Sequence, residues 1–305
     1  MRYLVTGGAG FIGSHLVEQL LQDQNCTVDV WDNLSTGSVR NLNAVWDEPR
    51  VTLHRSDVTE IANNRHGPGK FDVIFHLAAF PRIQPSFDAL RNTVASNVLG
   101  TAAIVEYAVK TGSPKLVAVS SSTCDGDPEA NPYALTKHHS EEIISMAPKI
   151  YSGLWTVAAR PYNVYGPRQP KEGSHATLIG IFENQTERGI PLTITGTGEK
   201  RRDFTHVSDI CRGLIHLAKC SELLGDPGQV FGLGTGKNYS VLEVAEMFQP
   251  GEERTHLPPR RGEAAVTLAK NTPPGWKAMN SLDVYVEEFK QSVTSRNDLR
   301  ESEIA

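Results

Sequence analysis

The chain of 305 residues lacks the features of nucleic-acid-binding and membrane-spanning proteins. Its formal net charge is −5, and its longest run of adjacent Lys and Arg covers only positions 200–202. Such a chain has no extended basic surface for a nucleic-acid backbone. Apolar runs fall short of the roughly 18–20 residues that cross a bilayer. We therefore expect neither nucleic acid nor a membrane as partner, and a basic pocket for a small anion stays open.

Cysteines are few, and their spacing does not resemble a metal-binding motif. The four are Cys26, Cys124, Cys211 and Cys220. We therefore expect reduced thiols and no metal site. A strand-like segment follows Met1 almost at once, which leaves no room for a signal peptide. These absences together predict a cytoplasmic protein.

The first half of the chain alternates regularly between strand-like and helix-like segments. Short apolar runs predict strands at 2–6, 27–32, 51–55, 71–77, 115–120 and 155–160. Helical periodicity marks 13–22, 94–109 and 133–146. Strands that alternate with helices form a parallel sheet covered on both faces. The pattern thus predicts an α/β fold with a doubly wound parallel sheet.

The second half is less regular. Gly and Pro become frequent after Gly166, and strand and helix signals become short. We assign 1–165 to the sheet domain and 166–290 to a smaller C-terminal α/β lobe that binds the substrate. Some segments of this lobe are expected to return to the first domain. The polar stretch 291–305 is expected to be a frayed tail.

The segment from Thr6 to Gly13, TGGAGFIG, joins the first predicted strand to the first predicted helix. Its glycines permit a tight turn and a close approach of the backbone to a pyrophosphate. The helix that follows offers free N–H groups to phosphate. Asp32 ends the second strand 19 residues after Gly13, where a carboxylate binds a ribose 2′-hydroxyl and repels a 2′-phosphate. The sequence therefore predicts a Rossmann-type domain that binds NAD rather than NADP.

A Tyr and a Lys one helical turn apart form the predicted catalytic pair. Tyr133 and Lys137 lie at i and i+4, on one face of the helix. An ordinary Tyr has a pKa of about 10, and a Lys ammonium together with a cationic nicotinamide ring lowers it toward neutrality. A Ser or Thr hydroxyl at a neighbouring strand end can orient the substrate. This set suits removal of a proton from an alcohol while a hydride passes to NAD.

Three hydroxyls compete for the third catalytic position, because the loop before Tyr133 is short. Counting from the strand end selects Ser122, which we prefer because strand geometry survives a loop deletion better than loop spacing does. Counting back from Gly126 selects Ser121 instead. Thr123 remains a third candidate.

These motifs resemble the extended short-chain dehydrogenase/reductase family, and within it the NAD-dependent nucleotide-sugar epimerases of the UDP-galactose 4-epimerase type. The resemblance runs almost from end to end of the chain. It rests on TGGAGFIG (6–13), DNLSTG (32–37), HLAA (76–79), NVLGT (97–101), VSSS (119–122), YALTK (133–137), RPYNVYGPRQ (160–169), GTGEKRRDFTHVSD (196–209), FGLGTGKNYSVLEVAEMF (231–248) and PPRRGE (258–263).

The resemblance implies two sets of binding residues and a homodimer. The implied NAD-binding residues are Gly7, Gly10, Phe11, Ile12, Gly13, Asp32, Asn33, Ser35, Thr36, Gly37, Asp57, Val58, Leu77, Ala78, Ala79, Asn97, Tyr133, Lys137 and Tyr162. The implied nucleotide-sugar residues are Ser122, Asn163, Arg202, Arg260 and Glu263. Arginine suits a diphosphate because its guanidinium group is planar and permanently charged. Family members usually dimerise through the helices at 94–109 and 133–146.

The leading hypothesis is epimerisation at C4 of a UDP-sugar, with a UDP-hexose as the expected substrate. Related 4,6-dehydratases carry a Thr-Asp-Glu triplet after the strand, and UDP-glucuronate decarboxylases carry a Glu shortly after the hydroxyl. Here the chain continues with Thr123, Cys124 and Asp125. A decarboxylase or dehydratase, a reductase of a keto sugar and a non-catalytic NAD-binding protein remain the alternatives. N-acetylated and uronic sugars also stay open, since Thr267 is small where a bulky aromatic would exclude an N-acetyl group.

Overall fold

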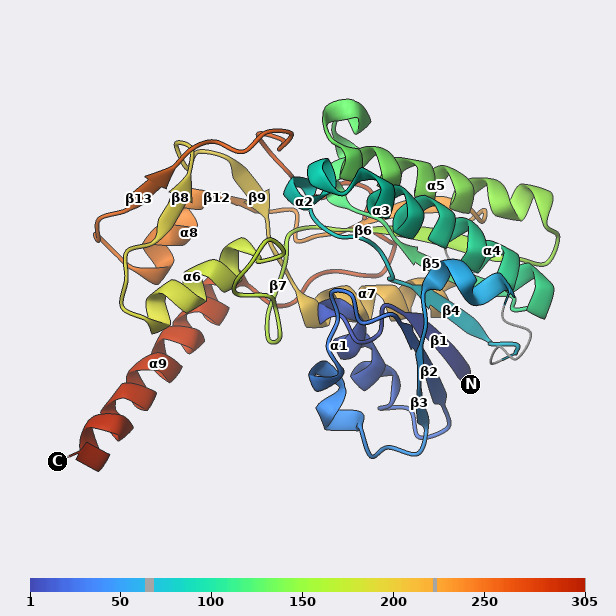
Figure 1. Cartoon of the computed structure of the whole chain (residues 1–305), viewed down its shortest axis with the longest axis horizontal. Coiled ribbons are helices and arrows are strands. Elements are labelled where there is room, and N and C mark those ends of the chain that lie inside the picture. The colour runs from blue at the N-terminus through green and yellow to red at the C-terminus, as the bar shows by residue number, and fades with distance from the viewer. Residues whose placement is uncertain (64–68, 222–223, 305) are drawn as a thin grey trace.

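Seven parallel strands form the central sheet of the computed structural model, which describes residues 1–63, 69–221 and 224–304 (Figure 1). They are β1 (Arg2–Thr6), β2 (Thr27–Asp32), β3 (Val51–Arg55), β4 (Val73–His76), β5 (Lys115–Val119), β6 (Trp155–Pro161) and β11 (Gln229–Leu233). Their order is β11-β6-β5-β4-β1-β2-β3. The order reverses between β1 and β4, the switch point where ligands bind in such sheets. The predicted Rossmann-type fold is confirmed.

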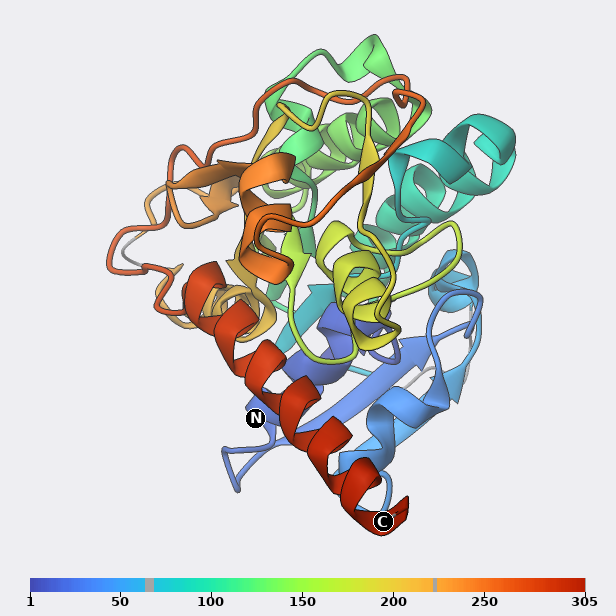
Figure 2. The same cartoon turned by 90° about the vertical axis from the view of Figure 1, so that its left-hand side faces the viewer.

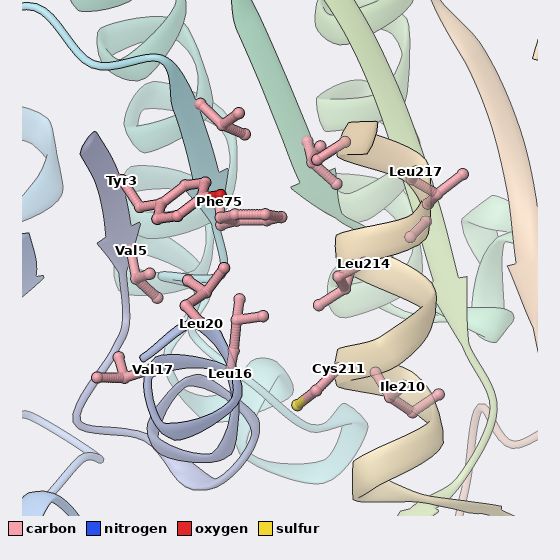
Figure 3. Packing of buried hydrophobic residues seen from close by; sticks show 14 of the residues in the cluster. Tyr3, Val5, Leu16, Val17, Leu20, Phe75, Ile210, Cys211, Leu214 and Leu217 are labelled. Atoms are coloured by element: carbon pink, nitrogen blue, oxygen red, sulfur yellow. The ribbon is translucent and has the colours of Figure 1, made fainter. Parts of the chain in front are cut away.

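Helices cover both faces of this sheet. The α-helices within the described residues are α1 (Phe11–Leu20), α2 (Ile83–Asp88), α3 (Leu90–Val94), α4 (Gly100–Thr111), α5 (Pro132–Ile150), α6 (Leu178–Glu187), α7 (Val207–Lys219), α8 (Val241–Phe248) and α9 (Leu282–Ile304). On one face, Leu16 of α1 and Leu214 of α7 join Val5 in one buried cluster (Figure 3). On the other face, Ile104 of α4 and Ile144 of α5 join a second cluster. Segments from the second half, α7 and β11, thus complete the first domain.

The helix expected at 94–109 is interrupted. It begins earlier, as α3, and passes through a π-helical turn at Ala95–Leu99 before α4 begins. The turn holds Asn97, which is buried and donates to Thr136 of α5 at 2.9 Å. Hydrophobic periodicity does not register a π turn, because it adds only one residue to the repeat.

The rest of the second half forms a small lobe of short strand pairs and helices. The pairs are β7 (Val164–Tyr165) with β10 (Thr205–His206), β8 (Thr193–Thr195) with β13 (Thr255–Leu257), and β9 (Arg201–Asp203) with β12 (Asn238–Ser240). Helices α6, α8 and α9 share a third buried cluster, to which Phe182, Val244 and Leu282 belong. This lobe therefore has its own apolar core beside the carboxyl edge of the sheet.

The polar end of the chain corrects one expectation. We expected a frayed tail at 291–305, but α9 continues as a helix to Ile304 (Figure 2), and residue 305 lies outside the described residues. Leu282 and Val286 anchor the start of α9 in the third cluster. The stretch that follows contains no Gly or Pro, so nothing in it stops the helix once it has begun.

The described ranges contain neither a membrane-spanning helix nor a cluster of metal ligands. Among the helices there, none combines the length and the hydrophobicity needed to cross a membrane. In the same ranges, no three His, Cys, Asp or Glu side chains gather where they could hold a metal ion.

Candidate active site

The glycine turn at the end of β1 lies at the switch point of the sheet. Gly7 has a φ of +71°, and a Cβ there would come within 2.7 Å of the Ala78 backbone nitrogen. A Cβ on Gly13 would overlap the carbonyl oxygen of Gly7. Both positions therefore require glycine, one for its conformation and one for its closeness to the turn.

The start of α1 is open to an anion. Gly10 caps the helix with extended backbone, and no side chain of the described residues accepts a hydrogen bond from the first turn. The N–H groups of the first helical residues therefore point outward with the positive end of the helix dipole. Phe11, Ile12 and Gly13 form this first turn, so the structure brings them where a pyrophosphate fits.

Asp32 connects the glycine turn to the end of β2. Its buried carboxylate accepts hydrogen bonds from the backbone N–H of Ala9 at 2.9 Å and of Leu34 at 2.8 Å. Burial raises the pKa of Asp32, and these two bonds act against that rise. Each carboxylate oxygen keeps a second lone pair, so the group can still accept from ribose hydroxyls.

The residues implied for the adenosine half of NAD gather beside Asp32. Asn33 donates to the Asp57 carboxylate at 2.7 Å, which joins the ends of β2 and β3. Gly37 packs on the Ala9 backbone, where a Cβ would come within 2.9 Å of the carbonyl carbon. The loop containing Asn33, Ser35, Thr36 and Gly37 therefore lies against the glycine turn, and Val58 follows Asp57 at the start of a 3₁₀ helix, Val58–Asn63.

The end of β4 supplies the other wall of the cofactor site. The Ala78 backbone N–H donates to the Thr6 hydroxyl at 3.2 Å, and the Leu77 N–H donates to the Thr6 carbonyl at 3.0 Å. These bonds hold 77–79, which includes Ala79, against the glycine turn. Small side chains at 78 and 79 let the backbone approach a ligand. The residues present fit a dinucleotide.

Two residues implied for NAD binding, Asn97 and Tyr162, form hydrogen bonds with other protein groups. The Asn97 side chain accepts from the Phe80 N–H at 2.7 Å and donates to the Phe80 carbonyl at 3.3 Å as well as to Thr136. The Tyr162 hydroxyl is fully buried and donates to the Asp125 carboxylate. These two side chains therefore shape the site through Phe80 and Asp125, and a direct contact of either with NAD stays a prediction.

The predicted catalytic pair, Tyr133 and Lys137, lies at the start of α5, beside the end of β5. Asn131 caps the helix by accepting from the Ala134 N–H at 2.7 Å. Lys137 is buried, and its ammonium donates to the Val119 carbonyl at 2.8 Å. Burial lowers the pKa of Lys137 to about 8. The ammonium is therefore mostly charged at pH 7, although a smaller fraction is charged than for a lysine in water.

The Ser121 side chain lies near enough to Tyr133 to affect the pKa of the phenol. Burial raises the pKa of Tyr133, while a hydrogen bond with the Ser121 side chain and the charge of Arg82 oppose the rise. Ser122 begins the 3₁₀ helix Ser122–Asp125, and the Thr123 hydroxyl is buried without a partner among the described residues. The effect of Ser121 on the pKa of Tyr133 favours the count from Gly126. Which hydroxyl acts stays a prediction.

A partly buried ionic network holds the shortened loop. Arg160, near the end of β6, donates to Glu141 of α5 at 2.7 and 2.6 Å and to Asp125 at 2.6 Å. Asp125 also accepts from Tyr162. Charge-assisted bonds of this kind are short and directional. The only acid of the Ser122–Asp125 turn is therefore bonded to Arg160 and Tyr162.

The implied substrate residues form one cluster and one separate group. Asn163 donates to the Asp203 carbonyl at 2.8 Å and to the Thr267 hydroxyl at 3.0 Å. Arg202 pairs with Glu263 at 3.6 Å, and burial lowers its pKa. Arg260 is exposed on the neighbouring segment of the loop 258–263. The structure therefore places Asn163, Arg202 and Glu263 around β9, Arg260 on the exposed part of the loop 258–263, and Ser122 at the start of the 3₁₀ helix after β5.

Sequence reasoning missed Arg82, which follows HLAA by three positions. Its guanidinium lies near enough to Tyr133 to affect the pKa of that phenol. Its Nε donates to the His175 carbonyl at 3.1 Å. The available signal was a charged residue just past a strand end at the switch point, which is where ligands bind in this fold.

Comparison with known proteins gives a consistent result. The profile of the NAD dependent epimerase/dehydratase family matches residues 3–234. UDP-glucuronic acid decarboxylase 6 of Arabidopsis thaliana is 31% identical, over 95% of this chain and 89% of its own. UDP-glucose 4-epimerase of Mycolicibacterium smegmatis is 33% identical, over 89% and 90%. The structure of UDP-glucuronic acid 4-epimerase from Bacillus cereus, in complex with UDP-glucuronic acid and NAD, is similar with a TM-score of 0.82, 25% identity and coverage of 97% and 99%.

Proposed function

Because the chain belongs to the NAD-dependent epimerase/dehydratase family, we propose that it is an enzyme that inverts C4 of a UDP-sugar through a transient 4-keto sugar. NAD is its cofactor, as in the family and in the related structure that contains it. The relatives include both a decarboxylase and an epimerase at similar identity. The choice between these reactions therefore rests on the residues of the site.

The observation that carries the proposal is the lack of a free carboxylate in the turn after the catalytic hydroxyl. If Ser121 takes the hydroxyl position, Ser122 and Thr123 take the positions of the Asp and Glu of the dehydratase triplet. Neither can serve as the acid or base of an elimination at neutral pH. Asp125, the acid of that turn, is bonded to Arg160 and Tyr162. The residues of this turn therefore favour reduction of the 4-keto sugar back to an alcohol over elimination.

The chain's own residues supply the acid–base part of the reaction. Tyr133 removes the proton from the 4-hydroxyl and later returns it, and the charged Lys137 favours the phenolate form. Ser121 orients the 4-hydroxyl by hydrogen bonding. NAD, when bound, takes a hydride from C4 and gives it back to the opposite face. Arg202 and Arg260 hold the diphosphate while the sugar ring turns over.

A substrate panel tests this reaction. The protein with its NAD is incubated with UDP-, GDP- and dTDP-sugars, and the products are identified by NMR. We expect a UDP-sugar to be converted into its C4 epimer with the carbon skeleton intact. A pentose product would instead show a decarboxylase, and a 4-keto-6-deoxy product would show a dehydratase. Inactivity on every nucleotide sugar would contradict an enzymatic function.

We also propose a homodimer formed through α4 and α5. Large apolar side chains are exposed at Leu99, just before α4, and at Met146 and Ile150 of α5. These three side chains are 57%, 41% and 60% exposed. A second copy related by a twofold axis would bury the same face on both subunits.

Charging this face is expected to separate the subunits. Leu99→Glu would place a carboxylate in the apolar contact without a partner, which is costly. We expect sedimentation velocity to show a dimer for the wild type and a monomer for the variant. Val284→Glu on α9, where Val284 is 55% exposed, is the matched control and should remain dimeric. A wild type that is monomeric at tens of micromolar would overturn the proposal.

A further inference from the structure

Arg82 adopts a backbone conformation that residues other than glycine rarely adopt. Its φ is +81° and its ψ is 142°, at the position that precedes α2. Such strain persists only where the surroundings enforce it, and it occurs most often at functional sites. The position at the carboxyl edge of β4 is on the ligand side of the sheet.

The contacts of α2 fix where Arg82 lies. On one side, Ser86 of α2 accepts a hydrogen bond from the Tyr133 N–H at 3.2 Å. On the other side, Gln84 donates to the Arg261 carbonyl at 2.9 Å, and the Arg261 guanidinium lies 3.8 Å above the centre of the Phe87 ring. The start of α2 is therefore held between the catalytic tyrosine and the arginine loop 258–263.

The Arg82 guanidinium has no counter-ion within the described residues. Across those ranges it forms no ion pair, and its hydrogen bond goes to a neutral carbonyl, that of His175. Arg82 is half-buried; burial lowers its pKa, a Tyr133 phenolate would raise it, and the nearby charge of Arg260 lowers it again. The Nε2 atom of His175 is itself buried without a partner in the described part of the chain.

A cation in this setting needs an anion. Removing a guanidinium from water is costly unless a negative group replaces the lost hydration. Here the described residues supply no carboxylate, Tyr133 offers a negative charge only in its phenolate form, and a second arginine adds repulsion. A ligand that brings an anionic oxygen group beside Tyr133 would relieve both costs, because a guanidinium binds a carboxylate or a phosphate through paired hydrogen bonds.

The place of Tyr133 in the reaction selects the group. In the proposed function Tyr133 contacts the 4-hydroxyl of the sugar. C6 is attached to C5, the carbon next to C4, whereas the diphosphate is attached to C1 on the far side of the ring. A carboxylate at C6 therefore lies closer to Tyr133 than the phosphates do. We infer that Arg82 is a specificity-determining residue that binds the C6 carboxylate, which makes a nucleotide-linked uronic acid the substrate class; this inference rests on the proposed 4-epimerase function.

Substitution of Arg82 separates the two anionic groups. We measure kcat/KM with UDP-glucuronic acid and with UDP-glucose. The wild type should prefer UDP-glucuronic acid. Arg82→Gln should lose about 100-fold on that substrate, as when one partner of a buried charge pair is removed, and only a few-fold on UDP-glucose. An equal loss on both substrates would assign Arg82 to a group common to both reactions, the Tyr133 phenolate or the diphosphate, and would overturn the inference.

Two further variants control for loss of folding and for the change in net charge. Arg82→Gly removes the charge and relieves the strained backbone, so it should melt no lower than the wild type while showing the same selective loss. Arg91→Gln, on the exposed surface of α3, makes the same change in net charge and should leave both rates unchanged. A wild type that epimerises UDP-glucose better than UDP-glucuronic acid would refute the uronic-acid inference and leave the epimerase proposal standing. A wild type that epimerises neither would refute the proposed function.

Discussion

Replacing Tyr133 by Phe is expected to lower kcat by about 10³-fold, within the range that a positioned general acid–base contributes. The change removes one hydroxyl group and keeps the aromatic ring that packs beside α2. We therefore expect NAD content and melting temperature to remain close to those of the wild type. The measurement is the rate of C4 epimerisation by NMR, with NAD content determined from the absorbance of the released cofactor.

The size of this effect follows from the electrostatics around the phenol. Burial raises the pKa of Tyr133, so the hydroxyl alone would be a poor base at pH 7. Ser121 and Arg82 oppose that rise, and the Lys137 ammonium favours the phenolate further once a substrate proton is in transit. Because burial lowers the pKa of Lys137 to about 8, its charge is present at pH 7 and is lost as the pH rises above 8.

Tyr151→Phe is the matched control, because Tyr151 is the C-cap of α5, at the opposite end of this helix from Tyr133. It should keep nearly all activity. A Tyr133→Phe variant that retained more than about a tenth of the wild-type kcat would show that another group moves the proton, since loss of a general base costs at least about 100-fold. The assignment of α5 as the catalytic helix would then be wrong.

Much of the fold and the cofactor site could be predicted because their signals are local. A Cβ at Gly7 or Gly13 would clash with nearby backbone atoms, so glycine is required at both positions and the motif can be found from the sequence. Parallel strands all end at one edge of the sheet, so Asp32 and Ala78 had to meet near that turn. The pair Tyr133 and Lys137 needed only helical spacing.

The parts that sequence could not supply depend on contacts between distant segments. The position of Arg82 depends on His175 and on the loop that contains Arg261. The π-helical turn around Asn97 arises from packing, and its single extra residue is too small a change to show in the hydrophobic pattern. The length of α9 arises from helix propensity that no Gly or Pro interrupts. Burial of Tyr162 against Asp125 likewise required the loop in place.

Replacing Ser121 by Ala is expected to lower kcat by about 100-fold, the cost of removing one oriented hydrogen-bond donor from an active site. The Ser121 side chain opposes the rise in the pKa of the Tyr133 phenol. The variant loses both the group that orients the substrate alcohol and a bond that favours the phenolate. Ser122→Ala should change kcat by only a few-fold, because Ser122 belongs to the 3₁₀ helix beyond this contact.

The comparison of these two variants decides how the shortened loop should be counted. Strand geometry favoured Ser122, but β5 ends at Val119 and Ser120 already lies outside the strand, so the strand end gives no fixed origin for the count. The network of Arg160, Asp125 and Glu141 holds the loop at Asp125, next to Gly126, and for this reason we prefer the count from Gly126. The pH dependence of kcat provides a readout that a packing defect would not change: Ser121→Ala should move its acidic limb to higher pH, because the phenolate loses a stabilising bond. A larger loss of kcat in Ser122→Ala, with the acidic limb of Ser121→Ala unmoved, would return the catalytic role to Ser122.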